Sequence, residues 1–203
     1  MQLDREEKGF SFSKEGPLDM RMDPSDDLTA REIVNEWPEE KLGEVFRDLG
    51  EEPRWRRAAR AIALGRKKKG LETTKELAEL IASTLGRGRN KKLHPATLIF
   101  QGLRICVNRE LESIQEALPK AIEVMSFGGR IGVMSFHSLE DGIVKRILNK
   151  GAFVPARNKY REYVEKPMLK LVNKKPLMAE KEEVRRNPRS RSARLRFAEK
   201  LGI

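Results

Sequence analysis

One short segment of the sequence gathers hydroxyl, imidazole and carboxylate groups. It covers residues 135–141, with the sequence SFHSLED. Because histidine exchanges protons near neutral pH, His137 together with Ser135 is a candidate for chemistry on a bound substrate. The same spacing has a structural interpretation, in which His137 is a satisfied turn histidine and Ser138 with Asp141 forms a helix capping box. Spacing alone leaves both interpretations open.

A second candidate lies in a loop near the start of the chain. Residues 17–23, with the sequence PLDMRMD, place Asp19 and Asp23 around Arg21. This arrangement of two carboxylates around a guanidinium, in a loop with Gly16 and Pro17, makes the segment a candidate site. An Asp and an Arg two residues apart in a loop are also commonly a local ion pair, and this alternative stays open as well.

Several common cofactor and catalytic motifs are absent from the sequence. It contains neither GxGxxG nor GxxxxGK[ST], the phosphate-binding loops of nucleotide enzymes, and no serine nucleophile elbow. Its one Cys and two His, at positions 106, 94 and 137, do not have the spacing of zinc ligands. We therefore predict no metal site.

The elements expected to position these residues change character along the chain. Residues 130–136 are a short apolar run after a double glycine, which is typical of a buried strand, and a helical pattern follows at once. The first candidate segment then lies at a strand-to-helix turn, where α/β folds place their ligands. Further strands are expected at 169–174 and 193–198, and a loop at 150–165. Helices are expected at residues 28–37 with Ser25 or Asp26 as the cap, 38–49, 53–64, 73–85, 95–118, a short run restarted by Pro119 to about 125, and 179–184.

The charge of the chain is large and unevenly distributed. The 203 residues include 42 Lys and Arg against 31 Asp and Glu, a net charge of +11. Residues 1–52 hold 16 acidic and 7 basic residues, so the net charge of −9 there leaves +20 for the remainder. Basic residues cluster at 54–69, 87–92 and 185–200. Solvated helix faces are one explanation, but the size of the imbalance favours a nucleic-acid partner.

Composition also excludes several classes of protein. No run approaches the roughly 18 apolar residues of a membrane-spanning helix, and the first ten residues lack the apolar core of a secretory signal. A single Cys suits a reducing compartment. We expect a cytoplasmic protein without membrane contact.

Five motifs, in order along the chain, together resemble one protein family. They are GFSF with GPLDMRMD at 9–23, HPAT at 94–97 with the helix after it, GGRI at 128–131, SFHSLED at 135–141, and NPRSRSARLR at 187–196. The resemblance is to the bacterial RsmH/MraW family, whose members methylate the exocyclic amine of a cytidine in 16S ribosomal RNA with S-adenosylmethionine. It runs from residue 1 to about residue 201.

The resemblance implies an α/β fold, a partial class I (Rossmann-like) methyltransferase sheet with a largely helical inserted domain. Residues 1–27 are then a loop leading from the methyltransferase core, residues 28–115 the helical insert for RNA recognition, and residues 116–203 the C-terminal part of the sheet. Family members carry further residues before this point, including the Gly-rich cofactor loop. We therefore expect the chain alone to be inactive. The alternative is a truncated, non-catalytic, basic RNA-binding remnant.

Individual residues have expected roles, of which only that of Gln2 is carried over from the family. Gln2 matches a residue that contacts S-adenosylmethionine, and it is the one cofactor position that carries over. Asp19, Arg21, Ser135 and His137 are expected to line the pocket for the target base. The expected partners are 16S ribosomal RNA in the small ribosomal subunit and a second copy of the chain. The residues expected to dock the RNA are Arg54, Arg57, Arg60, Lys67, Lys68, Arg87, Arg89, Lys91, Lys92, Arg189, Arg191 and Arg194.

Overall fold

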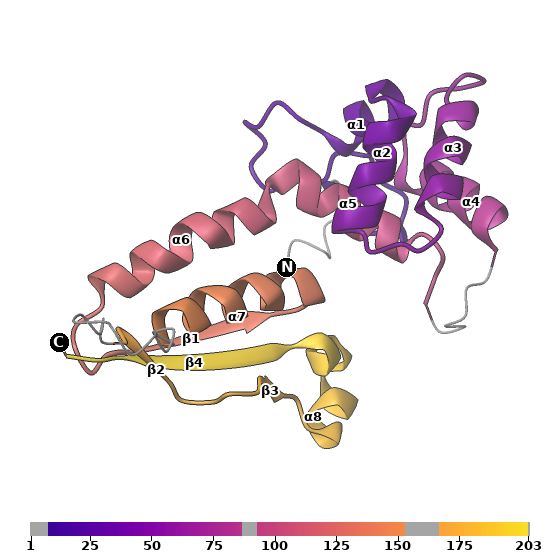
Figure 1. The fold of residues 1–203 in the computed structure, drawn as a ribbon. Helices are drawn as coiled ribbons and strands as arrows, with labels where there is room; N and C mark the ends of the chain where they lie inside the picture. Colours follow the sequence, from indigo (N-terminus) through magenta and orange to yellow (C-terminus); the bar gives the residue numbers. More distant parts are fainter. Residues whose placement is uncertain (1–7, 87–92, 153–166, 203) are drawn as a thin grey trace, which may run out of the picture. The chain divides into compact units, whose positions relative to one another are not determined.

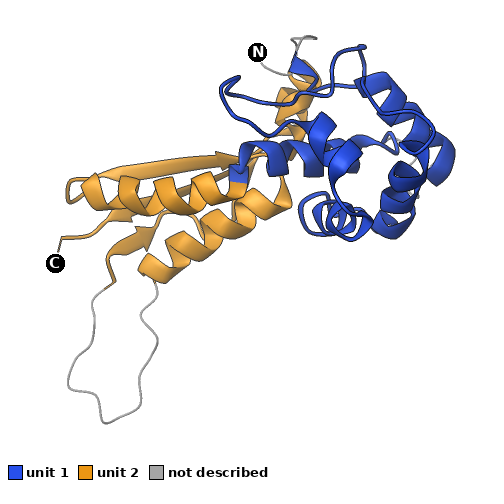
Figure 2. Ribbon diagram, turned by 90° about the horizontal axis from the view of Figure 1, so that it is seen from above, with its two compact units in different colours: residues 1–110 blue, residues 111–203 orange. Residues whose placement is uncertain are grey.

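A computed structural model describes residues 8–86, 93–152 and 167–202 of the chain. They form a mixed α/β structure with two compact units, residues 1–110 and residues 111–203 (Figure 2). Gln2 and the basic residues Arg87, Arg89, Lys91 and Lys92 lie outside the described residues, as does most of the loop expected at 150–165. Within the described part, no helix is long and apolar enough to cross a bilayer.

The first unit is helical and has its own apolar core. Phe46, Ile62, Ile81 and Leu103 are fully buried in it, which shows that the apolar positions at helical spacing face inward. The elements in chain order (Figure 1) are α1 (Ala30–Glu36), α2 (Glu39–Glu44), the π-helical segment η3 (Val45–Leu49), α3 (Trp55–Gly65), α4 (Thr74–Leu85) and α5 (Thr97–Asn108).

Capping boxes set the starts of two of these helices. Thr73 and Glu76 exchange hydrogen bonds at the start of α4, and the predicted start of this helix at residue 73 is confirmed. At α1 the same exchange joins Thr29 and Glu32, so the expectation of Ser25 or Asp26 as the cap is wrong. The reason is that Thr29 has a glutamate three residues later, whereas Ser25 is occupied by Asp23.

The prediction of a single helix over residues 95–118 is wrong, because the first helix ends at Asn108. Arg109 adopts the left-handed conformation with φ 48°, and α6 (Glu110–Val124) begins at the next residue. The expected interruption at Pro119 is also wrong, since α6 continues through it. Leu118 and Ile122, on either side of the proline, are buried in the core of the second unit, and their packing holds the helix together.

The second unit is built on a small antiparallel sheet. β1 (Arg130–Ser135) pairs with β4 (Arg194–Lys200), which also pairs with β2 (Leu169–Leu171) and β3 (Leu177–Met178). The first and last expected strands are confirmed, but the expected strand 169–174 ends at Leu171. The helical elements of this unit are α6, α7 (Ser138–Ala152), α8 (Lys181–Arg186) and the 3₁₀ segment η4 (Pro188–Ser192).

Helices cover one face of this sheet. Val144 and Leu148 of α7, with Leu118 and Ile122 of α6, pack against Ala198 and the strands beside it. The opposite face carries Met134 of β1 beside Leu195 of β4, and Leu195 also pairs with Leu177 of β3. Met134 and Leu177 are each 54% exposed, so this face is apolar and open in the described unit.

Candidate functional site

The first candidate segment lies where β1 ends and α7 begins. Ser135, the last residue of β1, is buried, and its hydroxyl donates to the carbonyl of Arg194 on β4 over 3.4 Å. His137 immediately precedes α7. The chain therefore places these two predicted residues at one strand-to-helix turn, and the hydroxyl of Ser135 is used within the sheet.

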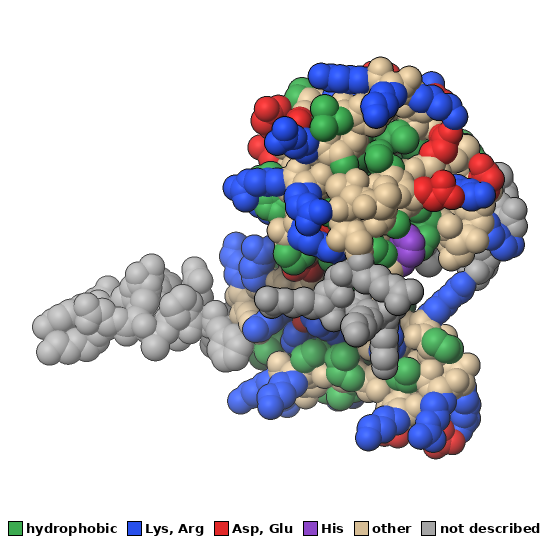
Figure 3. Space-filling view, turned by 90° about the vertical axis from the view of Figure 1, so that its right-hand side faces the viewer, with side chains coloured by type: hydrophobic (Ala, Val, Ile, Leu, Met, Phe, Trp, Pro, Cys, Tyr) green, Lys and Arg blue, Asp and Glu red, His purple; other side chains and the backbone are tan. Residues whose placement is uncertain are grey.

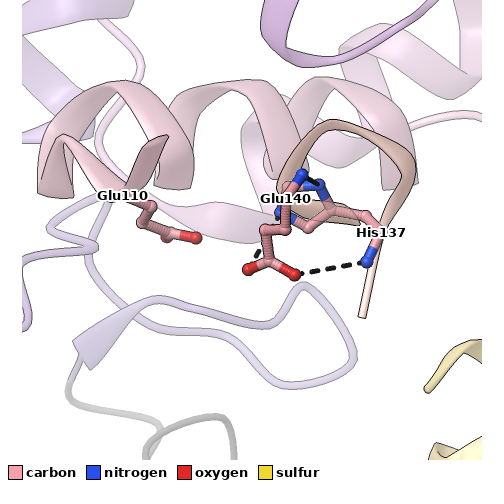
Figure 4. A group of neighbouring side chains, drawn as sticks. All are labelled: Glu110, His137 and Glu140. Carbon is pink, nitrogen blue, oxygen red and sulfur yellow. Dashed lines mark hydrogen bonds and ion pairs between the residues drawn. The ribbon is translucent and has the colours of Figure 1, made fainter. Parts of the chain in front are cut away.

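His137 and Glu140 together cap α7 (Figure 4). Oε2 of Glu140 accepts from the backbone N–H groups of Phe136 at 2.7 Å and of His137 at 3.3 Å. In return, the N–H of Glu140 points to Nδ1 of His137 at 3.5 Å. The arrangement is a capping box with histidine in the place of serine or threonine. The capping box predicted from Ser138 and Asp141 is wrong, because Glu140 performs that role.

The capping arrangement fixes the chemistry of the imidazole. With Nδ1 as an acceptor, the ring proton lies on Nε2. Nε2 is 3.2 Å from Oε1 of Glu140 but makes no hydrogen bond of good geometry there. Burial raises the pKa of Glu140, but the nearby imidazole of His137 and the hydrogen bond from the N–H of Phe136 outweigh it, so the pKa lies below its ordinary value. An ionised carboxylate thus lies beside a buried imidazole, and Oε1 of that carboxylate is the atom of the pair that can receive a proton.

Asp141, the next residue along α7, is held by two arginines of β4. Nε and Nη2 of Arg196 donate to its two carboxylate oxygens at 2.7 and 3.0 Å, and Nη1 of Arg194 lies 3.4 Å from Oδ2. The hydrogen bond with Arg196 lowers the pKa of Asp141, although burial opposes it. The spacing of the sequence gave no sign of this pair, since 55 residues separate its members.

The second candidate segment forms a clamp within the first unit. Oδ1 of Asp19 accepts from the backbone N–H of Arg21 at 3.0 Å and from its Nε at 2.8 Å, and Oδ2 accepts from Nη2 at 2.9 Å. The side-chain hydrogen bond from Arg21 lowers the pKa of Asp19. Nη1 of Arg21 donates to the carbonyls of Pro24 and Asp26. The local ion pair is therefore present, and it shapes the loop.

The residue between them has a strained backbone. Met20 is fully buried and has φ 63°, the left-handed conformation that non-glycine residues rarely adopt. Its N–H donates to the carbonyl of Lys8, and its carbonyl accepts from Nδ2 of Asn108. Such strain persists where the surroundings impose it, and it concentrates at functional sites.

Basic side chains lie on the surface of each unit (Figure 3). Those predicted for RNA docking have different surroundings. Arg54 and Arg57 donate to the carbonyls of Leu85 and Thr84 at the end of α4. Arg60 and the two lysines Lys67 and Lys68 are exposed.

The C-terminal set of predicted docking residues also divides. Arg189 and Arg191, in η4, are exposed, and Arg194 is partly buried beside Asp141.

The four residues expected to line the base pocket are divided between the units. Asp19 and Arg21 belong to the first unit, whereas Ser135 and His137 belong to the second.

Comparisons with known proteins agree on one family. The model of the MraW methylase family matches residues 1–201. The chain is 50% identical over 206 residues to the ribosomal RNA small subunit methyltransferase H of Protochlamydia amoebophila, covering 98% of this chain and 65% of that protein.

Similar proteins with the same name occur in other bacteria. That of Dehalococcoides mccartyi is 46% identical, over 99% of this chain and 57% of the relative. That of Synechocystis is 46% identical, over 98% of this chain and 60% of the relative. The chain thus spans about three fifths of the length of these relatives.

Proposed function

The chain belongs to the MraW methylase family, and we propose that it serves in the methylation of small-subunit ribosomal RNA. The observation that carries the proposal is the match over nearly the whole chain to relatives named as methyltransferases of that RNA. The excess of Lys and Arg over Asp and Glu suits a polyanionic substrate.

The finer proposal is that the methyl acceptor is the N4 amine of a cytidine in 16S ribosomal RNA. This amine is a poor nucleophile because its lone pair is delocalised into the ring. A site has to orient the amine and take up the proton that methylation releases. Oε1 of the ionised Glu140, held beside His137, is suited to take up this proton.

Asp19 is suited to orienting the amine. A carboxylate offers about four lone-pair sites, and Arg21 uses three of them on Asp19. One site on Oδ2 is left to accept an N–H from the base. We propose that Arg21 positions this carboxylate and that Ser135, through its bond to β4, positions the turn that carries His137.

S-adenosylmethionine is the methyl donor implied by the family. One groove that the described residues form on the sheet is too small for it. A groove on the open face of the sheet has a volume of about 270 Å³ and is lined by Arg130, Gly132, Val172 and Phe197. That is below the size usual for ligand pockets, roughly 300–1,000 Å³. We therefore propose that the 203-residue chain alone does not bind S-adenosylmethionine with micromolar affinity, which calorimetry would test.

Deleting the encoding gene tests the function directly. Mass spectrometry of small-subunit ribosomal RNA should show the loss of a methyl group from one cytidine, restored by the wild-type gene. A His137→Asn variant keeps a good N-cap side chain but lacks the imidazole, so it should fold and restore little methylation. Unchanged methylation after deletion would contradict the proposal.

A second candidate is a non-catalytic RNA-binding protein. The exposed basic residues Arg60, Lys67 and Lys68 favour it, because such residues can bind RNA phosphates whether or not the chain catalyses methylation. On this view, gene deletion leaves methylation intact while the purified chain still binds ribosomal RNA.

A further inference from the structure

The basic segment from Arg54 to Lys69 contains eight Lys and Arg and no acidic residue. The structure separates these residues into two sets. In the first set, Nη1 of Arg54 donates to the carbonyl of Leu85 at 2.8 Å, and Nη2 of Arg57 donates to that of Thr84 at 2.7 Å. The last carbonyls of a helix have no partner within it, so these two arginines stabilise the end of α4.

Two more members of the first set also hold the unit together. Nη1 of Arg66 donates to the carbonyl of Val34 on α1 at 2.9 Å, and Nζ of Lys69 lies 2.6 Å from Oε1 of Glu76 on α4. These contacts join the end of α3 to its neighbours. Half of the eight basic residues in this segment therefore have a structural role.

The residues of the second set have no such structural role. The side chains of Arg60, Lys67 and Lys68 are exposed and make no hydrogen bond or ion pair with any residue the structure describes. The guanidinium of Arg56 lies 4.1 Å from the centre of the Trp55 ring. Stacking on that ring orients Arg56 and leaves its N–H groups available to an acceptor.

Arg56 and Arg60 lie on α3, and Lys67 and Lys68 lie in the turn that follows it. Arg56 and Arg60 are four residues apart and therefore lie on the same side, one turn from each other. The N–H of Arg66 donates to the carbonyl of Ile62, and that of Lys68 to Gly65, so the helical winding continues past the end of α3. Lys67 and Lys68 extend the line of cations, which we name the cationic stripe.

The fold gains little from the cationic stripe. Like charges four residues apart on a helix repel each other. Arg60 lies in the middle of α3 and does not benefit from the partial negative charge at the helix C-terminus. The charge is therefore available to an external anion.

We propose that the cationic stripe of Arg56, Arg60, Lys67 and Lys68 binds the phosphate backbone of the RNA substrate. The inference rests on the proposed function for its choice of polyanion. A membrane surface fits less well, since a membrane-binding helix inserts its apolar face into lipid. Here Ala58, Ala59 and Ile62 form that face and are buried in the core of the first unit.

The salt dependence of RNA binding tests the proposal. The probe is a single-stranded fragment of 16S ribosomal RNA, titrated with the 203-residue chain by fluorescence anisotropy between about 50 and 200 mM salt. The test variant is Arg60→Gln, Lys67→Gln and Lys68→Gln together. The matched control removes three exposed lysines from separate helices, Lys75→Gln, Lys120→Gln and Lys145→Gln, with the same change in net charge.

The stripe variant should bind RNA more weakly than the control. The slope of log affinity against log salt should also fall in magnitude by about 2, because each phosphate contact on a single strand contributes about 0.7. Circular dichroism should show both variants folded. A slope equal to that of the control would overturn the proposal. Loss of binding to phosphatidylserine vesicles with an unchanged RNA slope would overturn it in favour of a lipid surface.

The methylation measurement separates this inference from the function on which it rests. Cytidine methylation that depends on the gene, with an unchanged RNA slope, overturns the cationic stripe alone. Methylation that does not depend on the gene, with a reduced slope, overturns the proposed function and leaves the cationic stripe as an RNA-binding surface.

Discussion

Arg196 of β4 holds Asp141 of α7 through two parallel hydrogen bonds, Nε to Oδ1 at 2.7 Å and Nη2 to Oδ2 at 3.0 Å. Both residues are buried. The planar guanidinium and carboxylate match in shape, so the pair fixes both direction and distance. It ties the first turn of α7 to the sheet, directly beside the turn that carries His137.

Removing one member of this pair should destabilise the second unit. Asp141→Ala leaves the charge of Arg196 buried without a counterion, and we expect the free energy of unfolding to fall by about 3–5 kcal/mol. Hydrogen exchange of the β4 amides in urea reports on this unit. The double variant Asp141→Leu with Arg196→Met should recover most of the loss, since apolar residues often replace a buried pair without cost. A loss below about 1 kcal/mol in the single variant would contradict the prediction.

The same pair should make the second unit sensitive to acid. The pKa of Asp141 is lower in the folded chain than in the unfolded chain, chiefly because of Arg196. Its contribution to stability is therefore fully present above the ordinary Asp pKa of about 3.9, and it is lost as the pH falls through the lowered value. Stability should decrease less between pH 7 and pH 3 in the double variant than in the wild type. Equal decreases would rule out this role of Asp141.

Lys69 should control the titration of Glu76. The pKa of Glu76 is lowered to about 2, first by the hydrogen bond from Lys69 and then by the backbone N–H groups of Glu72 and Thr73. Lys69→Gln should therefore raise this pKa, as followed by the NMR shift of the carboxyl carbon. Lys75→Gln, which removes an exposed lysine one residue from Glu76, serves as the control and should leave the pKa near 2. An unchanged pKa in Lys69→Gln would show that the backbone bonds alone suffice.

The open face of the sheet should limit solubility. Met134 and Leu177 are each 54% exposed and lie beside Leu195. Contiguous apolar surface of this kind promotes association. Met134→Lys with Leu177→Lys should raise the concentration at which light scattering detects aggregates, with little change in melting temperature. Val124→Lys, at a residue that is 84% exposed in α6, is the control. Equal improvement by the control would mean that the sheet face has no special part in association.

The helices of the first unit could be predicted from the sequence because their signals are local. Thr73 with Glu76, and Gly86 at the end of α4, mark boundaries within a few residues of each other. The break at Arg109 has no such signal. It depends on Asn108, whose side chain bonds to the carbonyl of Met20 and accepts from the N–H of Met22, more than 80 residues earlier in the chain. Only the folded chain brings these groups together.

The candidate site was predictable to a similar extent. The sequence identified the turn with Ser135 and His137, but not the partner of either side chain. Glu140 replaced Asp141 as the capping carboxylate because Asp141 is occupied by Arg196, a contact between distant parts of the chain. The RNA-docking role of the basic residues stays a prediction. The bonds of Arg54 and Arg57 to α4 show that charge alone does not separate structural groups from docking groups.

The two units have separate hydrophobic cores, one around Phe46 and Ile62 and one around Val144 and Leu148. Each core can lose its packing without the other, so unfolding of this chain should not be a single cooperative transition. Calorimetry should then give a calorimetric enthalpy larger than the van't Hoff enthalpy. A single melting temperature describes such a chain poorly, and each substitution has to be assigned to the transition of the unit that contains it.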